Sequence, residues 1–222
     1  MKGCPLSCWW CHNPEGIRPD PENYIKEIML DGRKICETVT AGEWISLDEL
    51  MKEIEKERVF MDESRGGVTF SGGEPFNQPE FLLAALRECN ARSIHTCVDT
   101  SGNTSEQWIR EAAENVDLFL YDLKIIDDGE HRKFTGISNK QILNNLKTLI
   151  ELKSGIIIRI PVIPGINDHP DQINKMIHYL KELNGITNVD LLPYHHYARN
   201  KYGRCRCRGA KRMASKAKIT AR

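Results

Sequence analysis

Three cysteines near the start of the chain have the residue type and spacing that point most directly to chemistry. Cys4, Cys8 and Cys11 are separated by three and then two residues, so one tight loop can present all three thiolates. A four-iron cluster usually takes four cysteine ligands, and three would leave one iron with an open coordination position for a substrate. The spacing therefore predicts a catalytic iron–sulfur site.

A zinc site is the alternative interpretation of these cysteines. Zinc ligands usually occur as paired CxxC motifs or as CxxC with HxxxH, and the spacing here fits neither pattern. His12 is a nominal fourth ligand, but His12 and the adjacent Cys11 can hardly both reach one tetrahedral ion. Zinc is therefore the weaker interpretation.

Charged residues at or near the ends of apolar runs form a second group. Asp99 closes one run and Asp122 with Lys124 closes the next, and a mutual ion pair is the alternative to a functional role for Asp122 and Lys124. Arg159 lies within the apolar run IIIRIPVIPG, where an unpaired charge is costly to bury. Its partner is either a bound ligand or an internal Asp or Glu.

A pair of glycines follows another apolar run. Residues 71–75 read SGGEP directly after Phe70. Glycines at a strand end let the backbone approach a ligand closely, although an ordinary turn explains an isolated pair equally well. Other cysteines and histidines carry weaker signals: we expect buried thiols at Cys89 and Cys97, and surface or capping roles at His95, His131, His169 and His178.

Alternating strands and helices must position these residues. Short runs of β-branched and aromatic residues predict strands over 67–70, 95–99, 118–123, 156–162 and 189–192. Amphipathic stretches between them predict helices, with capping-box spacing at Ser46, Thr104 and Ser138. No pair of strands reads as a hairpin. The pattern predicts a parallel barrel or doubly wound sheet, in which the chemistry lies at the C-terminal ends of the strands.

Length and charge narrow the class of protein. The 222 residues are enough for one domain with a sizeable core. Ten of the 31 basic residues lie from Arg199 onward, so the preceding chain has 21 basic against 31 acidic residues. That balance argues against a nucleic-acid-binding body. No apolar run is long enough for a membrane span and no signal peptide is visible, so we expect a cytoplasmic protein.

The segment KGCPLSCWWCHNPE, residues 2–15, resembles the cluster loop of the glycyl radical enzyme activating enzymes, a group of the radical S-adenosylmethionine (SAM) superfamily that includes the pyruvate formate-lyase activating enzyme. The likeness continues to about Tyr202. It implies an α/β fold, a partial (β/α)6 radical SAM barrel, in which Cys4, Cys8 and Cys11 hold one [4Fe–4S] cluster. SAM is the implied second cofactor.

The same resemblance implies roles for individual residues. The GGE segment matches the motif that binds the SAM amino group, DLK matches a segment that contacts SAM, and His195 matches a histidine that contacts the SAM nucleoside. With SAM as the ligand, a bidentate contact to it would satisfy Arg159, although an internal salt bridge would do so equally well. Trp10 and His12 would pack over SAM, and Asp99 and Asp122 would also help to hold a monovalent cation. The implied cofactor-binding residues are Trp10, Cys11, His12, Gly72, Gly73, Glu74, Asp99, Asp122, Leu123, Lys124, Arg159 and His195.

The implied activity is reductive cleavage of SAM to a 5′-deoxyadenosyl radical, which abstracts the α-hydrogen of a glycine in a partner glycyl radical enzyme. The electron would come from a flavodoxin or ferredoxin type donor under anaerobic conditions, and we expect a monomer that binds neither nucleic acid nor membrane. Two alternatives are a radical SAM enzyme with a small-molecule substrate and an inactive, truncated metal-binding fragment.

The chain also departs from the family pattern. Met1 stands three residues before Cys4, so the first barrel strand is expected to be missing. We expect a radical SAM core over residues 1–202, with 13–42 as a shortened insert over the barrel mouth that has one cysteine, Cys36, and no auxiliary cluster. Residues 203–222 are basic and poor in apolar residues, which predicts a disordered tail in which Cys205 and Cys207 are incidental.

Overall fold

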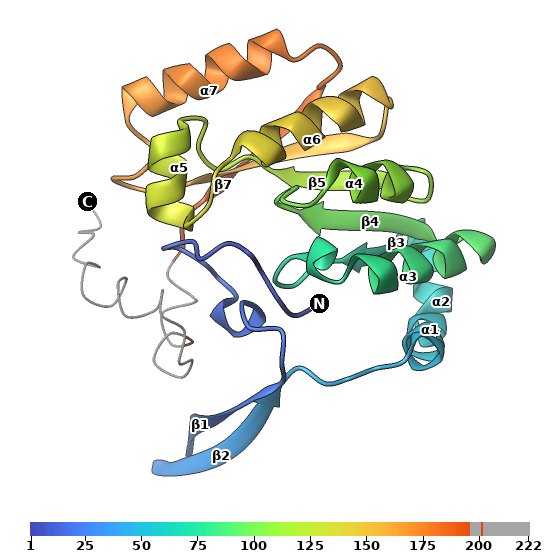
Figure 1. Cartoon of the computed structure of the whole chain (residues 1–222). Coiled ribbons are helices and arrows are strands. Elements are labelled where there is room, and N and C mark those ends of the chain that lie inside the picture. Colours follow the sequence, from blue (N-terminus) through green and yellow to red (C-terminus); the bar gives the residue numbers. More distant parts are fainter. Residues whose placement is uncertain (196–200, 202–222) are drawn as a thin grey trace.

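The computed structural model describes residues 1–195 and 201, except for the side chains of residues 26, 27 and 34. Its centre is a five-stranded parallel sheet whose strands lie in sequence order (Figure 1). The strands are β3 (Gly67–Phe70), β4 (His95–Thr100), β5 (Leu118–Asp122), β6 (Ile156–Val162) and β7 (Asn188–Pro193). The five predicted strands are confirmed. Parallel neighbours need crossover connections, and helices supply them.

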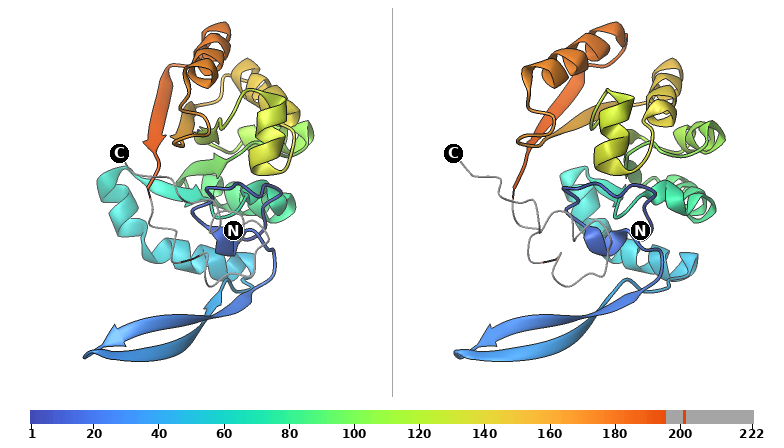
Figure 2. Two further views of the ribbon diagram at one scale, coloured as in Figure 1. Left: turned by 90° about the vertical axis from the view of Figure 1, so that its left-hand side faces the viewer. Right: turned by 60° about the vertical axis from the view of Figure 1, so that its left-hand side comes forward.

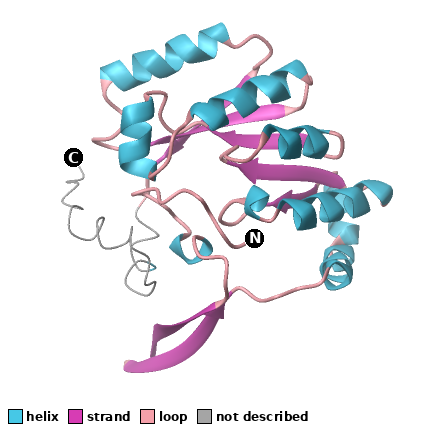
Figure 3. Ribbon diagram, in the orientation of Figure 1, coloured by secondary structure: helices cyan, strands magenta, loops and turns pink. Residues whose placement is uncertain are grey.

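Helices cover one face of the sheet (Figures 1 and 3). The longer ones are α1 (Leu47–Lys56), α3 (Pro79–Ala91), α4 (Glu106–Ala113), α6 (Lys140–Glu151) and α7 (Pro170–Glu182). The shorter elements are α2 (Arg58–Ser64), α5 (Asp128–Thr135) and two 3₁₀ turns, η1 (Pro14–Gly16) and η2 (Pro75–Asn77). The main core lies between helices and sheet, where the predicted stripe Ile142, Leu146 and Leu149 of α6 is buried at 2% exposure or less.

Helix starts were predicted with mixed success. The capping box at Ser46 is present, because its side chain accepts from the Glu49 N–H and the Glu49 carboxylate accepts from the Ser46 N–H. The other two predicted caps are each one residue early, since α4 begins after Ser105 and α6 after Asn139. Ser138 instead donates its hydroxyl to Asp128 at 2.5 Å, a long-range partner that sequence spacing does not reveal.

A β-hairpin is the main departure from the sequence prediction. Strands β1 (Glu22–Leu30) and β2 (Arg33–Ala41) pair antiparallel around Asp31 and Gly32, both with positive φ, as a type I′ turn requires. The hairpin extends away from the five-stranded sheet in all views, rather than lying as an insert over the barrel mouth (Figures 1 and 2). Within the described residues, no helix is long and apolar enough to cross a membrane.

Candidate active site

A cavity of about 520 Å³ lies where the cysteine loop meets the C-terminal ends of the parallel strands. Cys4, Cys8 and Cys11 line it, together with every predicted SAM contact except Leu123. A cavity of this size is within the range of ligand pockets for small molecules. Residues from the start of the chain and from its last described strand are therefore brought to one site, as the strand-end prediction required.

Leu123 is the predicted contact that the structure places elsewhere. Its side chain is 1% exposed and packs in the main core, on the helix side of the sheet. Successive residues of an extended chain point to opposite faces, so Leu123 points away from the cavity that Asp122 and Lys124 line. Of the predicted DLK contacts, Asp122 and Lys124 therefore line the cavity and Leu123 does not.

The cysteine loop closes on itself through backbone hydrogen bonds. The N–H of Gly3 donates to the carbonyl oxygen of Gly16 at 2.8 Å, and the N–H of Cys4 donates to that of Ile17 at 3.0 Å. Inside the loop, the N–H of Cys11 donates to the carbonyl oxygen of Cys8 at 3.2 Å. The three thiols are therefore held in one short, closed segment.

The glycine pair seats this loop against β3. The N–H of Gly73 donates to the Met1 carbonyl oxygen at 2.8 Å, and that of Glu74 to the Gly3 carbonyl oxygen at 2.7 Å. A Cβ atom on Gly73 would lie far inside van der Waals contact of the carbonyl oxygens of Gly3 and Gly16. The pair is thus more than an ordinary turn, because it allows the chain's own cysteine loop to approach closely.

The three thiols fit a cluster better than a single ion. Burial raises the pKa of Cys4 to about 11 and that of Cys8 to about 12, so metal binding has to displace their protons. Among the described residues, no three His, Cys, Asp or Glu side chains converge on one ion position. A four-iron cluster needs no such convergence, since each thiolate binds a different iron. The three thiols therefore form a donor set that fits the predicted [4Fe–4S] group.

Glu74 is buried and joins the ends of two strands. Its carboxylate accepts from the Thr100 hydroxyl at 2.6 Å and from the Ser101 hydroxyl and N–H at 2.5 and 2.8 Å, and more weakly from the Phe76 N–H at 3.3 Å. Burial raises its pKa, although these donors act against that rise. Both carboxylate oxygens thus already accept hydrogen bonds within the protein, whereas Gly72 and Gly73 line the cavity.

We predict that Glu74→Ala lowers the free energy of unfolding by about 3 kcal/mol, because it leaves buried donors without their acceptor. Glu74→Gln keeps a side-chain acceptor and should cost less than half as much. Urea unfolding of the cluster-free chain measures both. An alanine variant as stable as the glutamine variant would show that the carboxylate does not hold the two strand ends together.

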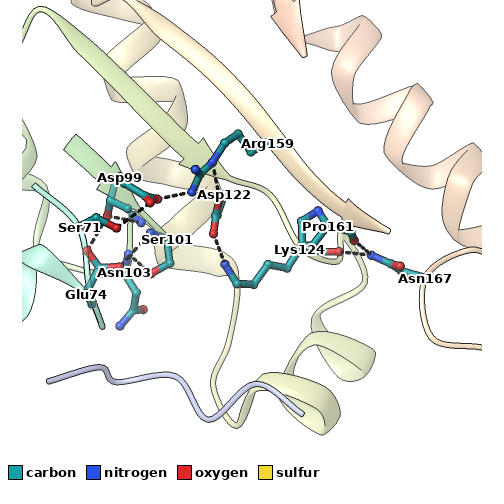
Figure 4. A network of polar contacts seen from close by, with 12 residues as sticks. Ser71, Glu74, Asp99, Ser101, Asn103, Asp122, Lys124, Arg159, Pro161 and Asn167 are labelled. Carbon is teal, nitrogen blue, oxygen red and sulfur yellow. Dashed lines mark hydrogen bonds and ion pairs between the residues drawn. The ribbon is translucent and has the colours of Figure 1, made fainter. Parts of the chain in front are cut away.

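A network of charges lines the cavity beside the glycine pair (Figure 4). Arg159 donates to Asp122 through Nε at 3.0 Å and Nη2 at 2.8 Å, and Nη2 also contacts Asp99. Lys124 donates to the other oxygen of Asp122 at 2.8 Å, and Ser71 donates to Asp99 at 2.7 Å. The ion pair between Asp122 and Lys124 and the internal carboxylate partners of Arg159, both left open by the sequence, are therefore present.

The two carboxylates differ in their charge balance. Burial alone would raise the pKa of Asp122, but Lys124 and Arg159 outweigh it and hold that pKa below its usual value. The pKa of Asp99 is raised by burial and by repulsion from Asp122, which the shared Arg159 does not fully offset. Asp122 is therefore the firmly ionised member of the pair.

We predict that Asp122→Asn destabilises the chain by about 3 kcal/mol at pH 7, since it leaves two buried cations with one carboxylate. Asp99→Asn should cost only about 1 kcal/mol. Because the folded pKa of Asp122 is depressed, its stabilising contribution is present above the usual Asp pKa and is lost as pH falls through the folded value. Urea unfolding of both variants at a series of pH values measures these losses and their pH dependence. Equal losses of stability in Asp122→Asn and Asp99→Asn would contradict the conclusion that Asp122 is the firmly ionised carboxylate.

Aromatic side chains also line the cavity. The rings of His12 and His195 have centroids 4.1 Å apart, and Tyr194 lies 5.8 Å from His12. Burial, with smaller contributions from His195 and Lys201, lowers the pKa of His12 and favours its neutral form at pH 7. Trp10 is 5% exposed. The predicted basic tail, residues 203–222 with Cys205 and Cys207, lies outside the described residues.

Several buried polar residues that hold the strand-end loops carry no signal in the sequence. Asn167 donates to the carbonyl oxygens of Lys124 and Pro161 at 3.0 and 2.7 Å, and Asn145 donates to those of Gly102 and Thr104, both at 2.8 Å. An asparagine in a polar stretch usually indicates a turn, so no local signal marks these contacts. His131, expected at the surface or a cap, is also buried, at 1% exposure. Cys89 and Cys97 are buried, as predicted.

Comparison with known proteins adds a family to this geometry. Residues 1–180 match the model of the Radical SAM superfamily. The chain is 41% identical to the trans-4-hydroxy-L-proline dehydratase activating enzyme of Clostridioides difficile, over 91% of this chain and 80% of that protein. It is 35% identical to the choline trimethylamine-lyase activating enzyme of Oleidesulfovibrio alaskensis, over 91% and 79% respectively. A solved domain of the pyruvate-formate lyase-activating enzyme from Bacteroides vulgatus is 38% identical, with a TM-score of 0.55 over 59% of this chain and 81% of that one.

Proposed function

The chain belongs to the glycyl radical enzyme activating enzymes of the radical SAM superfamily, and from that membership we propose that it cleaves SAM reductively and takes an α-hydrogen atom from a glycine of a partner glycyl radical enzyme. One observation carries the proposal for this chain. The three cysteine thiols, the glycine pair and the charge network line the same cavity. A protein that only stored a metal would have no need of the last two features.

The cysteines would hold a [4Fe–4S] cluster through Cys4, Cys8 and Cys11. When bound, this cluster supplies one electron that breaks a carbon–sulfur bond of SAM, and the open iron provides a place for the SAM amino and carboxylate groups. The cysteine loop supplies three thiolates, and its closed segment contains no fourth cysteine.

The strand ends would bind the methionine end of SAM. Arg159 contacts the two aspartates through Nε and Nη2, so Nη1 is left to donate to the SAM carboxylate. The carbonyl groups of Gly72 and Gly73 are acceptors for the SAM amino group, whereas the Glu74 carboxylate is already occupied. Lys124 keeps Asp122 ionised and places a positive charge next to the cysteines.

The aromatic residues that line the cavity would bind the nucleoside of SAM. Neutral His12, Trp10 and His195 offer flat surfaces and ring nitrogens that suit an adenosine group. A monovalent cation between Asp99 and Asp122 has support from the family resemblance alone. Arg159 contacts both carboxylates and would have to move aside for such an ion.

The proposal extends to partners and setting. A flavodoxin or ferredoxin type protein would supply the electron, the chain would act as a monomer, and the reaction would take place in an anaerobic cytoplasm. Support for these points comes from the resemblance of the sequence to its family. The two relatives are named for different partner enzymes, so the family alone leaves open which glycyl radical enzyme this chain activates.

The proposal is tested by following deuterium from the glycine of the partner enzyme into 5′-deoxyadenosine. The reduced, cluster-loaded chain is incubated with SAM and a panel of glycyl radical enzymes carrying α-deuterated glycine, including trans-4-hydroxy-L-proline dehydratase and choline trimethylamine-lyase. We expect deuterium in the 5′-deoxyadenosine product and a glycine-centred radical in the matching partner, and neither when its glycine is replaced by alanine. Cleavage that depends on a small molecule instead would favour the other radical SAM interpretation, and absence of cleavage would favour an inactive fragment.

A further inference from the structure

The C-terminal turn of α5 contacts the cysteine loop on both sides of Cys8. The N–H of Ser7 donates to the carbonyl oxygen of Thr135 at 2.8 Å, and the N–H of Trp9 donates to that of Phe134 at 3.0 Å. The last carbonyl groups of a helix have no partner within the helix, so α5 offers these acceptors without losing a helical bond. Two hydrogen bonds thus fix the backbone that flanks Cys8.

Side chains reinforce this backbone contact. Phe134 is 7% exposed and meets the Trp9 ring edge to face, with centroids 4.9 Å apart. Phe134 also belongs to a small apolar cluster, separate from the main core, that contains Trp10, Ile125 and Ile163 and against which Cys8 packs. The cysteine loop therefore has a hydrophobic support of its own, and Phe134 connects that support to α5.

The residue that ends α5 also has to be small. Gly136 has a φ of +89°, a left-handed conformation that glycine adopts without strain. A Cβ atom at this position would come within 2.6 Å of the Ser7 hydroxyl oxygen. Replacing Gly136 should therefore strain the helix end and displace the Ser7 hydroxyl, which donates to the Thr135 carbonyl oxygen at 3.3 Å.

Two charged residues of the cavity lie on the N-terminal side of α5. Asp122 and Lys124 lie just before α5, and the stretch between them and the helix is braced by Asn139, which donates to the carbonyl oxygens of Ile125 and Ile126 at 3.0 and 2.7 Å. Asp127 caps α5 by accepting from the Glu130 N–H at 3.0 Å. Residues 122–136 thus form one braced segment between the charge network and Cys8.

We propose that Phe134 and Gly136 are positioning residues for the iron–sulfur cluster, and that the α5 turn fixes Cys8 relative to Asp122 and Lys124. This inference rests on the proposed function, because it assumes that the cysteine loop binds a cluster. It goes further by assigning the support of that loop to a helix end that is remote from it in the sequence. Neither residue lines the cavity, so both act through Cys8.

The test compares two variants with matched controls. Phe134→Leu is paired with Phe119→Leu, because Phe119 is a phenylalanine of β5 that is fully buried in the main core. Gly136→Ala is paired with Gly32→Ala, since Gly32 has a φ of +74° in the hairpin turn and a Cβ atom there would meet nothing within 4 Å beyond its chain neighbours. Each full-length chain is reconstituted with iron and sulfide without oxygen. The rate of iron loss to a chelator, the reduced-cluster electron paramagnetic resonance spectrum and the thermal melting of the cluster-free chain are measured.

We expect Phe134→Leu and Gly136→Ala to lose iron about tenfold faster than the unmodified chain, and the two controls to stay within about twofold. The spectrum should change only in Phe134→Leu and Gly136→Ala, although the melting temperature of the cluster-free chain falls in the controls as well. Equal iron loss in variants and controls would overturn the inference while leaving the proposed function intact. If Phe134→Leu does not fold, Gly136→Ala decides the outcome. Failure of the unmodified chain to bind a cluster would overturn both.

Discussion

Cys8→Ala is expected to leave a folded chain that retains almost no iron–sulfur cluster. Cys8 is one of only three thiolates in the loop, and its backbone is fixed by hydrogen bonds on both sides. With two ligands remaining, the cluster would lose one of its three protein attachments. Iron and sulfide content after reconstitution, together with SAM cleavage, measures the effect, and both should fall to background.

The matched control is Cys89→Ala. Cys89 is a fully buried thiol of α3 that packs in the main core and does not line the cavity. The Cys89→Ala chain should be less stable than the unmodified chain but should keep its full iron content. A cluster that survives in Cys8→Ala, or that is lost equally in Cys89→Ala, would contradict the assignment of the cysteine loop as the iron site.

Arg159→Leu should produce the largest loss of stability among the cavity residues, about 3–5 kcal/mol. The substitution removes the cation that contacts both Asp99 and Asp122 and leaves two neighbouring carboxylates with Lys124 alone. Arg159→Lys keeps the charge but cannot contact both carboxylates as a planar fork. Its free energy of unfolding should therefore lie between those of the unmodified chain and Arg159→Leu. Urea unfolding of the cluster-free chain at pH 7 provides the comparison.

The pH dependence of this loss has a definite sign. In the unmodified chain the depressed folded pKa of Asp122 makes its contribution stabilising above the usual Asp pKa. Without Arg159 that pKa rises, so the difference between the two chains should be full at pH 7 and shrink as the pH falls below about 4. Adding Asp99→Asn to Arg159→Leu should recover part of the stability. A leucine variant within about 1 kcal/mol of the unmodified chain, with no rescue, would contradict the charge network.

The parallel sheet could be predicted from the sequence because its strands are strong local signals. Each is a short run of β-branched or aromatic residues followed by turn residues, and the structure places all five within one residue or so of the predicted ends. The hairpin 22–41 was missed even though Asp31 and Gly32 are a typical turn pair. Its strands mix apolar and charged residues without a regular alternation, and none of their described side chains belongs to a hydrophobic cluster.

The site was predictable where topology brings strand ends together. Asp99, Asp122 and Arg159 each lie at or near the C-terminal part of a parallel strand, and such ends share one edge of the sheet. The family resemblance covers the whole tripeptide DLK, but side chains alternate along an extended chain. Asp122 and Lys124 therefore line the cavity, whereas Leu123 packs in the main core. The support of the cysteine loop by Phe134 and Thr135 could not be predicted, because those contacts join residues remote in sequence and involve backbone groups that no motif records.

The most direct test of the account is to reconstitute the purified chain with iron and sulfide without oxygen, reduce it, and record its electron paramagnetic resonance spectrum with and without SAM. Cys8→Ala serves as the control. The account predicts a reduced four-iron signal that shifts when SAM is added, with release of 5′-deoxyadenosine. A chain that binds no cluster, or a cluster whose spectrum is indifferent to SAM, would contradict it.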